Sequence, residues 1–211
     1  MLFLIYKHIR RVEWALLLAL VVSLGTAVFP FVQQCRQISD KVVRLHILAN
    51  SNTSADQRLK LQVRDRILQE TGDQLRTSVR KEDAEQQIRA LLPEIERIAE
   101  EELRSRGCTD SVHADLTDMY FTTRTYDSGT LPAGNYRALR ITIGAGAGEN
   151  WWCVMFPPMC LSAAAEPSPN TQLEDVLAED ELDIVTHPDS YQIRLKLVEW
   201  WTQLVQWFCG T

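Results

Sequence analysis

The chain has 211 residues, of which 45% are hydrophobic and 24% charged, so it can form an apolar core and is not of the disordered class. Its formal net charge at pH 7 is −6. Residues 1–39 hold four Lys or Arg against Glu13, a net of +3, so the remainder carries −9. An acidic body argues against nucleic-acid binding, because phosphate contacts need a basic face.

The N-terminal segment is apolar over a long run. No charged side chain occurs from residue 14 to residue 35, and the apolar part, 14–32, as a helix nearly spans a hydrocarbon core of ~30 Å. Basic residues at positions 7, 10 and 11 precede it, as the positive-inside rule expects. Two interpretations stay open: an uncleaved membrane anchor, or a cleaved signal peptide. Both predict a signal or transmembrane segment over 1–38 and an extracytoplasmic domain over 39–211.

Regular elements are expected next. Residues 41–50 (KVVRLHILAN) predict a strand with Arg44 and His46 on one face. Ser54 and Gln57 have capping-box spacing and predict a helix that Gly72 ends. A second helical region, 82–106, contains Pro93, so we expect a kink or two abutting helices, with Gly107 at the C-terminal cap.

The second half of the body predicts strands and then a helix. Residues 111–126 and 136–143 are rich in strand formers around the turn-rich DSGTLPAGN, which indicates a long β-hairpin. Residues 163–189 predict an exposed acidic insertion with one short helix near 173–177. From residue 191 the apolar residues fit both the alternation of a strand and the three-to-four-residue spacing of a helix. The length of the segment favours a helix, with an apolar stripe through Ile193, Leu197, Trp200 or Trp201, Leu204 and Phe208.

These elements predict an α+β fold. We expect a two-layer domain, with a small, mainly antiparallel sheet backed by helices and preceded by one N-terminal transmembrane or signal helix.

The sequence matches short motifs for catalysis or phosphate binding only weakly. Residues 127–130 (DSGT) match the aspartic protease motif, but they fall in the expected hairpin turn, where these residue types are common. The glycine run 144–150 (GAGAGEN) lacks the residues of a phosphate loop and indicates close backbone approach to a neighbour. The four histidines are scattered, so no metal site is expected.

The stretch NWWCVMFPPMC (150–160) carries two of the five cysteines. Outside the cytoplasm Cys153 and Cys160 are candidates for a disulfide across a two-proline turn, with two buried thiols as the alternative. A Cys153–His46 pair would make an extracytoplasmic thiol hydrolase, a rival function.

Three segments resemble one known family. LPAGNYRALRITIGAGAGENWWCVMFPPMC (131–160) is similar to the signature segment of the stage II sporulation protein R family, RLHILANSNTSADQRLKLQVRD (44–65) to its other recurrent block, and RLKLVEWW (194–201) to its closing segment. The resemblance covers nearly the whole predicted body, in order.

The resemblance implies a signalling role in endospore formation. Such proteins are made in the forespore and exported into the intermembrane space. There they activate a membrane-embedded aspartic protease of the mother-cell side, which processes a sigma-factor precursor. It implies no catalytic residue, no cofactor and no small-molecule substrate.

Partner contacts are expected at polar and aromatic residues of the two recurrent blocks. The candidates are Arg44, His46, Asn50, Asn150, Trp151 and Trp152. The alternative for the two tryptophans is that they are core residues. A structural module of the spore envelope is a third possible function.

Overall fold

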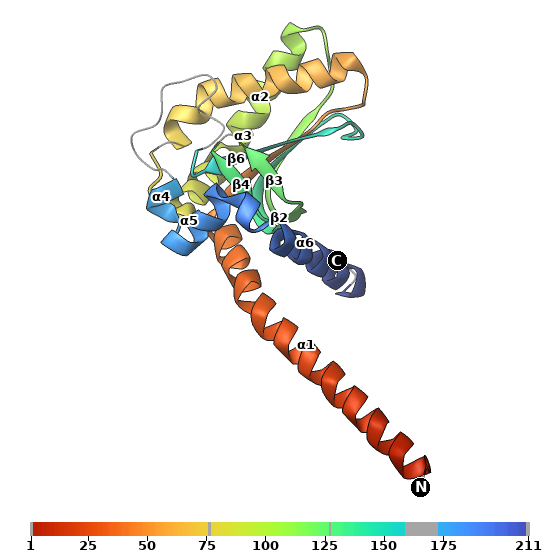
Figure 1. The fold of residues 1–211 in the computed structure, drawn as a ribbon. Coiled ribbons are helices and arrows are strands. Elements are labelled where there is room, and N and C mark those ends of the chain that lie inside the picture. Colours follow the sequence, from red (N-terminus) through yellow and green to blue (C-terminus); the bar gives the residue numbers. More distant parts are fainter. Residues whose placement is uncertain (1, 76, 127, 159–172, 210–211) are drawn as a thin grey trace.

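The computed structural model describes residues 2–75, 77–126, 128–158 and 173–209 (Figure 1). The helices and strands, in chain order, are α1 Leu2–Lys41, β1 Val43–Leu48, α2 Ser54–Leu75, α3 Lys81–Ser105, β2 Val112–Phe121, β3 Arg124–Tyr126, β4 Gly129–Leu131, β5 Gly134–Ile143, β6 Asn150–Phe156, α4 Leu173–Val176, α5 Glu179–Thr186 and α6 Gln192–Cys209. A turn of 3-10 helix, Pro188–Ser190, precedes α6.

The central sheet has the strand order β2-β5-β1-β6. β5 is antiparallel to β2 and β6 is antiparallel to β1, but β1 and β5 run parallel, so the sheet is mixed. The expected α+β class is confirmed, and the sheet is mainly but not wholly antiparallel. A parallel pair needs a long crossover, which the two helices between β1 and β2 provide together with β2 itself.

The expected hairpin is present as β2 and β5, with a smaller hairpin of β3 and β4 at its tip. The predicted DSGT stretch covers the turn between β3 and β4 and the first two residues of β4, and its Asp127 lies outside the described residues. Gly129 has a φ of +150°, and a Cβ there would lie 2.5 Å from a methyl carbon of Val185. Close packing against α5 therefore requires glycine at this turn.

Helices α2 and α3 cover one face of the sheet. Val43, Leu45 and Ile47 of β1 are fully buried there together with Ile88 and Ile95 of α3. The predicted ends of α2 need correction. Thr53, not Ser54, caps the helix, since the Asp56 amide donates to Thr53 Oγ1 at 3.2 Å, and the helix continues past Gly72.

Helix α3 is one helix with Pro93 inside it, not the two abutting helices offered as an alternative. It ends as expected at Gly107, whose φ is +76°. The Cys108 amide donates to the Leu103 carbonyl at 2.9 Å and the Gly107 amide to the Arg104 carbonyl at 3.0 Å, which is the bonding of a Schellman cap.

The other face of the sheet is also covered, so the expected two-layer arrangement is wrong. The end of α1, α5 and the start of α6 pack there, and the buried side chains of this layer include Ile38, Leu177, Ile184, Val185 and Leu195. In the second half of the predicted insertion, four residues are buried against the body, while Glu174, Asp175, Glu179, Asp180 and Asp183 are exposed, and the short helix expected near 173–177 is α4. Residues 159–172, which hold its first half, lie outside the described residues.

Buried Glu181 fixes α5 to α1. Its carboxylate accepts from Lys41 Nζ at 2.5 Å and from the Ala178 amide at 2.8 Å, and it is 2% exposed. A buried carboxylate needs such partners.

Helix α1 projects from the body for most of its length (Figure 1). Its 40 residues make a rod of about 60 Å. Phe31, Cys35 and Ile38 are buried in the body, so the predicted boundary at 38/39 falls within a helix whose last turns belong to the core. Within the described part of the chain, no helix combines the length and apolarity needed to cross a membrane.

Candidate functional site

Strands β1 and β6 lie side by side and bring most of the candidate residues together. Trp152 pairs with His46 across the two strands, and Asn150 pairs with Leu48. The side chains of Arg44, His46 and Trp152 therefore share one face of the sheet, the face that α1, α5 and α6 cover.

Arg44 is fully buried in an aromatic box. Its guanidinium carbon lies 4.0 Å from the centre of the Phe121 ring and 4.9 Å from that of Tyr136, and Nη2 donates to the Tyr126 hydroxyl. Nε and Nη1 are buried with no hydrogen-bond partner. Burial lowers the pKa of Arg44, and the neighbouring tyrosines partly oppose this shift. The rings thus contact the guanidinium through their π faces, which are favourable for a cation, while one of its three nitrogens has a hydrogen bond.

His46 continues this buried row. Its ring stacks on Trp152, with centroids 4.2 Å apart and planes 5° from parallel, and Nε2 lies 2.8 Å from Asn150 Oδ1. Because Oδ1 is an acceptor, the proton is on Nε2, and the buried Nδ1 has no partner. We call these residues the Arg44 cluster: Arg44, His46, Phe121, Tyr126, Tyr136 and Trp152.

The other candidates lie apart from this cluster. Trp151 points to the opposite face, where the Arg64 guanidinium lies 4.6 Å from its ring centre. Asn50 braces the glycine run, since its Oδ1 accepts from the Ala145 amide at 2.9 Å. Of the six candidates, Asn150 is the exposed one, so the sequence pattern marked mainly residues that hold the strands together.

The Cys153–His46 pair does not form. Cys153 pairs with Leu45 and lies in the α2–α3 core, so its sulfur and the His46 ring are on opposite faces of the sheet. Cys153 is disulfide-bonded, whereas Cys35 and Cys108 are free. Cys160 lies outside the described residues, so the predicted bridge to Cys160 stays a prediction. The rival function as a thiol hydrolase loses its catalytic pair.

Metal chemistry has no support in the described ranges, which contain no group of three or more His, Cys, Asp or Glu arranged to hold an ion. The hydrogen-bond partner of His46 is an amide, neither a thiol nor a hydroxyl.

The aromatic box around Arg44 did not emerge from sequence reasoning. Phe121 and Tyr136 come from the β2–β5 hairpin, and the parallel register, in which Arg44 pairs with Ala138, brings them to β1. The signal available in the sequence was Arg44, a charged residue inside the apolar strand predicted at 41–50. Such a residue indicates that it has partners on the same face of the sheet, but it does not identify them.

The buried histidine predicts a pH-dependent stability. Burial lowers the pKa of His46, and the charges of Arg140 and Lys60 act in the same direction. Below the unfolded-state pKa of about 6.5 the unfolded chain binds the proton more readily, so the free energy of unfolding falls as pH falls through that value. Denaturant unfolding should show that the free energy of unfolding falls less between pH 7.5 and pH 5 in the His46→Gln variant than in the parent protein.

His113→Gln is the matched control, because its side chain is 74% exposed. An equal pH dependence in the parent and the His46→Gln variant would contradict this account.

Comparisons with known proteins agree with the resemblance of the segments. The family model described as stage II sporulation protein R matches residues 39–166. The stage II sporulation protein R of Bacillus subtilis (strain 168) is 35% identical over 185 residues, which cover 79% of this chain and 83% of that protein. No solved structure matches the chain. On both the family match and this identity, the chain belongs to the stage II sporulation protein R family.

Proposed function

We propose that this protein is an intercellular signal in endospore formation, which activates a membrane-embedded aspartic protease and is not itself an enzyme. The observation that carries the proposal is the family match over 39–166. The separation of Cys153 from His46 by the sheet supports it further, since it removes the catalytic pair of the rival hydrolase.

The proposal includes export from the forespore. The charge-free segment 14–32 would serve as the signal or membrane segment, and the body would lie in the intermembrane space, either tethered or released. An oxidising location agrees with the disulfide bond at Cys153.

Activation would work by a population shift. A ligand that binds the active form of the protease more tightly than the inactive form raises the active fraction without chemistry of its own. The surface that we assign to this contact is the rim 144–150, where Ala145, Ala147, Glu149 and Asn150 are exposed at the start of β6. The buried Arg44 cluster would hold this rim rather than touch the protease.

The test is a membrane reconstitution with the protease and its sigma-factor precursor. We expect cleavage with the added protein and none without it. Ala147→Arg, a bulky change on the exposed rim, should lower the cleavage rate about tenfold, and Gln69→Arg, the same bulk at an exposed position of α2, should not. Asp127→Ala should leave the rate unchanged.

Cleavage without the protein would refute the activator role. Loss of cleavage with a folded Asp127→Ala variant would show that the DSGT stretch has a chemical role. Equal effects of Ala147→Arg and Gln69→Arg would refute the rim as the contact surface.

A further inference from the structure

Helix α6 presents two apolar faces, and the body covers one of them. Leu195 and Val198 are buried against the body, and Thr202 shares a hydrogen bond of 3.2 Å with Tyr120. Ile193, Trp200 and Trp207 are 79%, 70% and 77% exposed. At about 100° of rotation per residue, these two sets lie on roughly opposite sides of the helix.

The exposed side of α6 carries Ile193, Leu197 and Trp200 of the apolar stripe that the sequence pattern marked, whereas the side chains of Leu204 and Phe208 are not among those that the structure describes. A stripe of this kind ordinarily faces the core, yet here a second, smaller set of residues makes the core contact. Monomeric proteins in water rarely leave a large contiguous apolar patch uncovered. We define the outer face of α6 by Ile193, Leu197, Trp200 and Trp207, which are exposed to between 37% and 79%.

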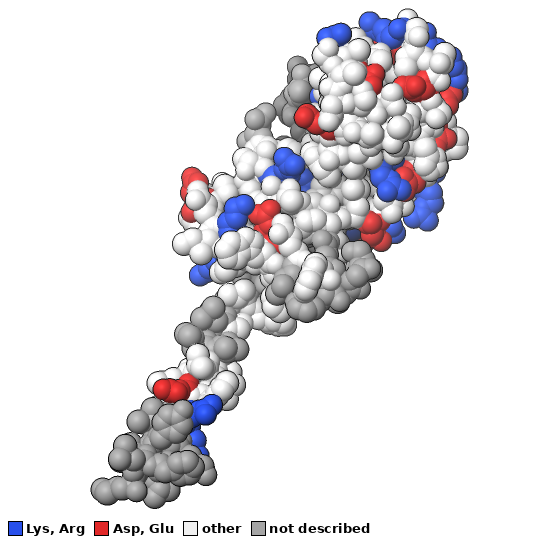
Figure 2. Space-filling view, turned by 90° about the vertical axis from the view of Figure 1, so that its right-hand side faces the viewer, with Lys and Arg blue, Asp and Glu red and all other residues white. Residues whose placement is uncertain are grey.

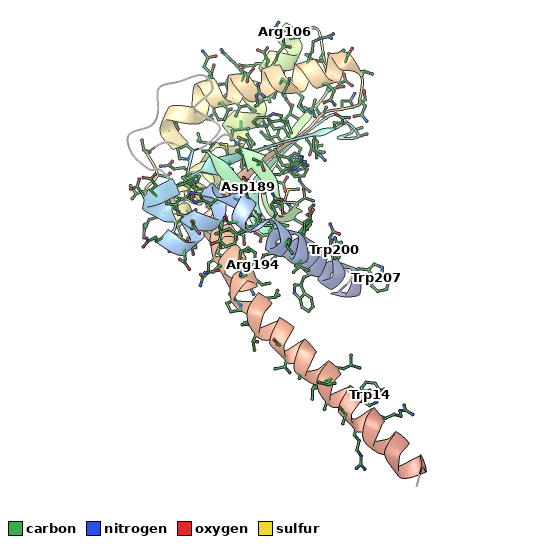
Figure 3. All side chains as sticks on the ribbon, in the orientation of Figure 1. Trp14, Arg106, Asp189, Arg194, Trp200 and Trp207 are labelled. Atoms are coloured by element: carbon green, nitrogen blue, oxygen red, sulfur yellow. The ribbon has the colours of Figure 1, made fainter. Side chains whose placement is uncertain are left out.

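The position of α6 indicates what that occupant is. Its first turn is joined to α1 at the end of the charge-free segment 14–32, where the Phe31 ring stacks on Tyr191 with centroids 5.6 Å apart. Figure 3 shows Trp200 and Trp207 of α6 on the side of the molecule toward which α1 and its Trp14 project. Many charged side chains lie over α2 and α3 at the far end of the body, and others lie on its middle and lower parts, where α5 carries exposed Glu179, Asp180 and Asp183 (Figure 2).

The chemistry of the face fits a lipid surface. Tryptophan is enriched at membrane–water interfaces, because its ring is apolar and its N–H needs a polar partner. No charged residue occurs from Trp200 to residue 211. Arg194 and Lys196 lie on either side of the outer face by helical rotation, where cations reach anionic headgroups, and Lys196 also pairs with Glu199 at 2.9 Å.

We propose that the outer face of α6 lies on the surface of a bilayer that contains anionic lipid, at the level where the charge-free segment of α1 ends. This surface is distinct from the rim 144–150, and its level in the bilayer rests on the membrane segment 14–32 of the proposed function but not on protease activation. It would hold the body against the membrane and limit the orientations in which the rim meets a partner.

The test is hydrogen exchange by mass spectrometry on the full chain, with and without vesicles of phosphatidylcholine and phosphatidylglycerol. Peptides from α6 should exchange about tenfold more slowly with vesicles present. A Trp200→Gln/Trp207→Gln variant should lose this protection while peptides from the sheet keep theirs. Val79→Gln, a change at a 68% exposed apolar residue between α2 and α3, is the control and should keep it.

Two outcomes would overturn the proposal. In the first, vesicles slow exchange in α1 but not in α6. In the second, α6 becomes protected without lipid as the protein concentration rises, which would make its outer face a contact between two copies of the chain. Both readouts are independent of protease activation, because the vesicles contain no protease.

Discussion

Replacement of Arg44 by alanine should lower the free energy of unfolding by about 3–5 kcal/mol, as large-to-small changes at fully buried sites do. Arg44 is 0% exposed and fills the space between Phe121 and Tyr136. Alanine would leave a cavity there and remove the hydrogen bond to Tyr126. Urea denaturation at neutral pH measures the difference.

The matched variant is Arg44→Met. Methionine keeps most of the volume and removes the cost of burying Nε and Nη1 without partners. We expect the free energy of unfolding of Arg44→Met to fall by less than half of the decrease caused by Arg44→Ala. If the two variants are equally unstable, the charge and its contacts with the rings carry the stability of the cluster, rather than its volume.

Replacement of Gly148 by alanine should lower the free energy of unfolding by about 2–4 kcal/mol, which is at or above the usual range for overpacking. A Cβ at this position would collide with the Ser51 carbonyl oxygen and lie 2.9 Å from Ala49 Cβ. Backbone atoms cannot rotate away, so the loop would have to move. That movement would strain the bond from the Gly148 amide to the Ala49 carbonyl, which measures 2.9 Å.

Gly134→Ala is the control for this change. A Cβ there would meet Tyr136 at 3.6 Å, an ordinary contact, so the effect should stay below about 1 kcal/mol. Thermal unfolding of both variants gives the comparison. A Gly148→Ala variant as stable as Gly134→Ala would show that the glycine run is not clamped against residues 49–51.

Periodicity was enough to predict most helices and the hairpin, because these features depend on neighbours in sequence. It was not enough for β6. The stretch NWWCVMF is apolar on both sides, since Trp151 and Cys153 face the α2–α3 core while Trp152 and Val154 face the other layer. A strand buried on both faces loses the alternation that identifies a strand.

Long-range pairing explains the remaining differences. The parallel contact of β1 with β5 joins residues about ninety positions apart, and no local pattern encodes it. The sequence could place Arg44 and His46 on one face, which is confirmed, but not supply the rings around Arg44. In α6 the helix was predicted correctly, whereas Leu195 and Val198, not the larger stripe, make the core contact.

The burial of the last turns of α1 limits where a peptidase could cut the chain without removing core contacts. Phe31, Cys35 and Ile38 are at most 3% exposed, and the burial of Phe31 and of Ile38 contributes roughly 1.5–3 kcal/mol each. Burial also raises the pKa of Cys35 to about 12, so its sulfur stays a protonated core thiol. A cut ahead of Phe31 would leave these three contacts in place, whereas a cut after Ile38 would remove all three from the core.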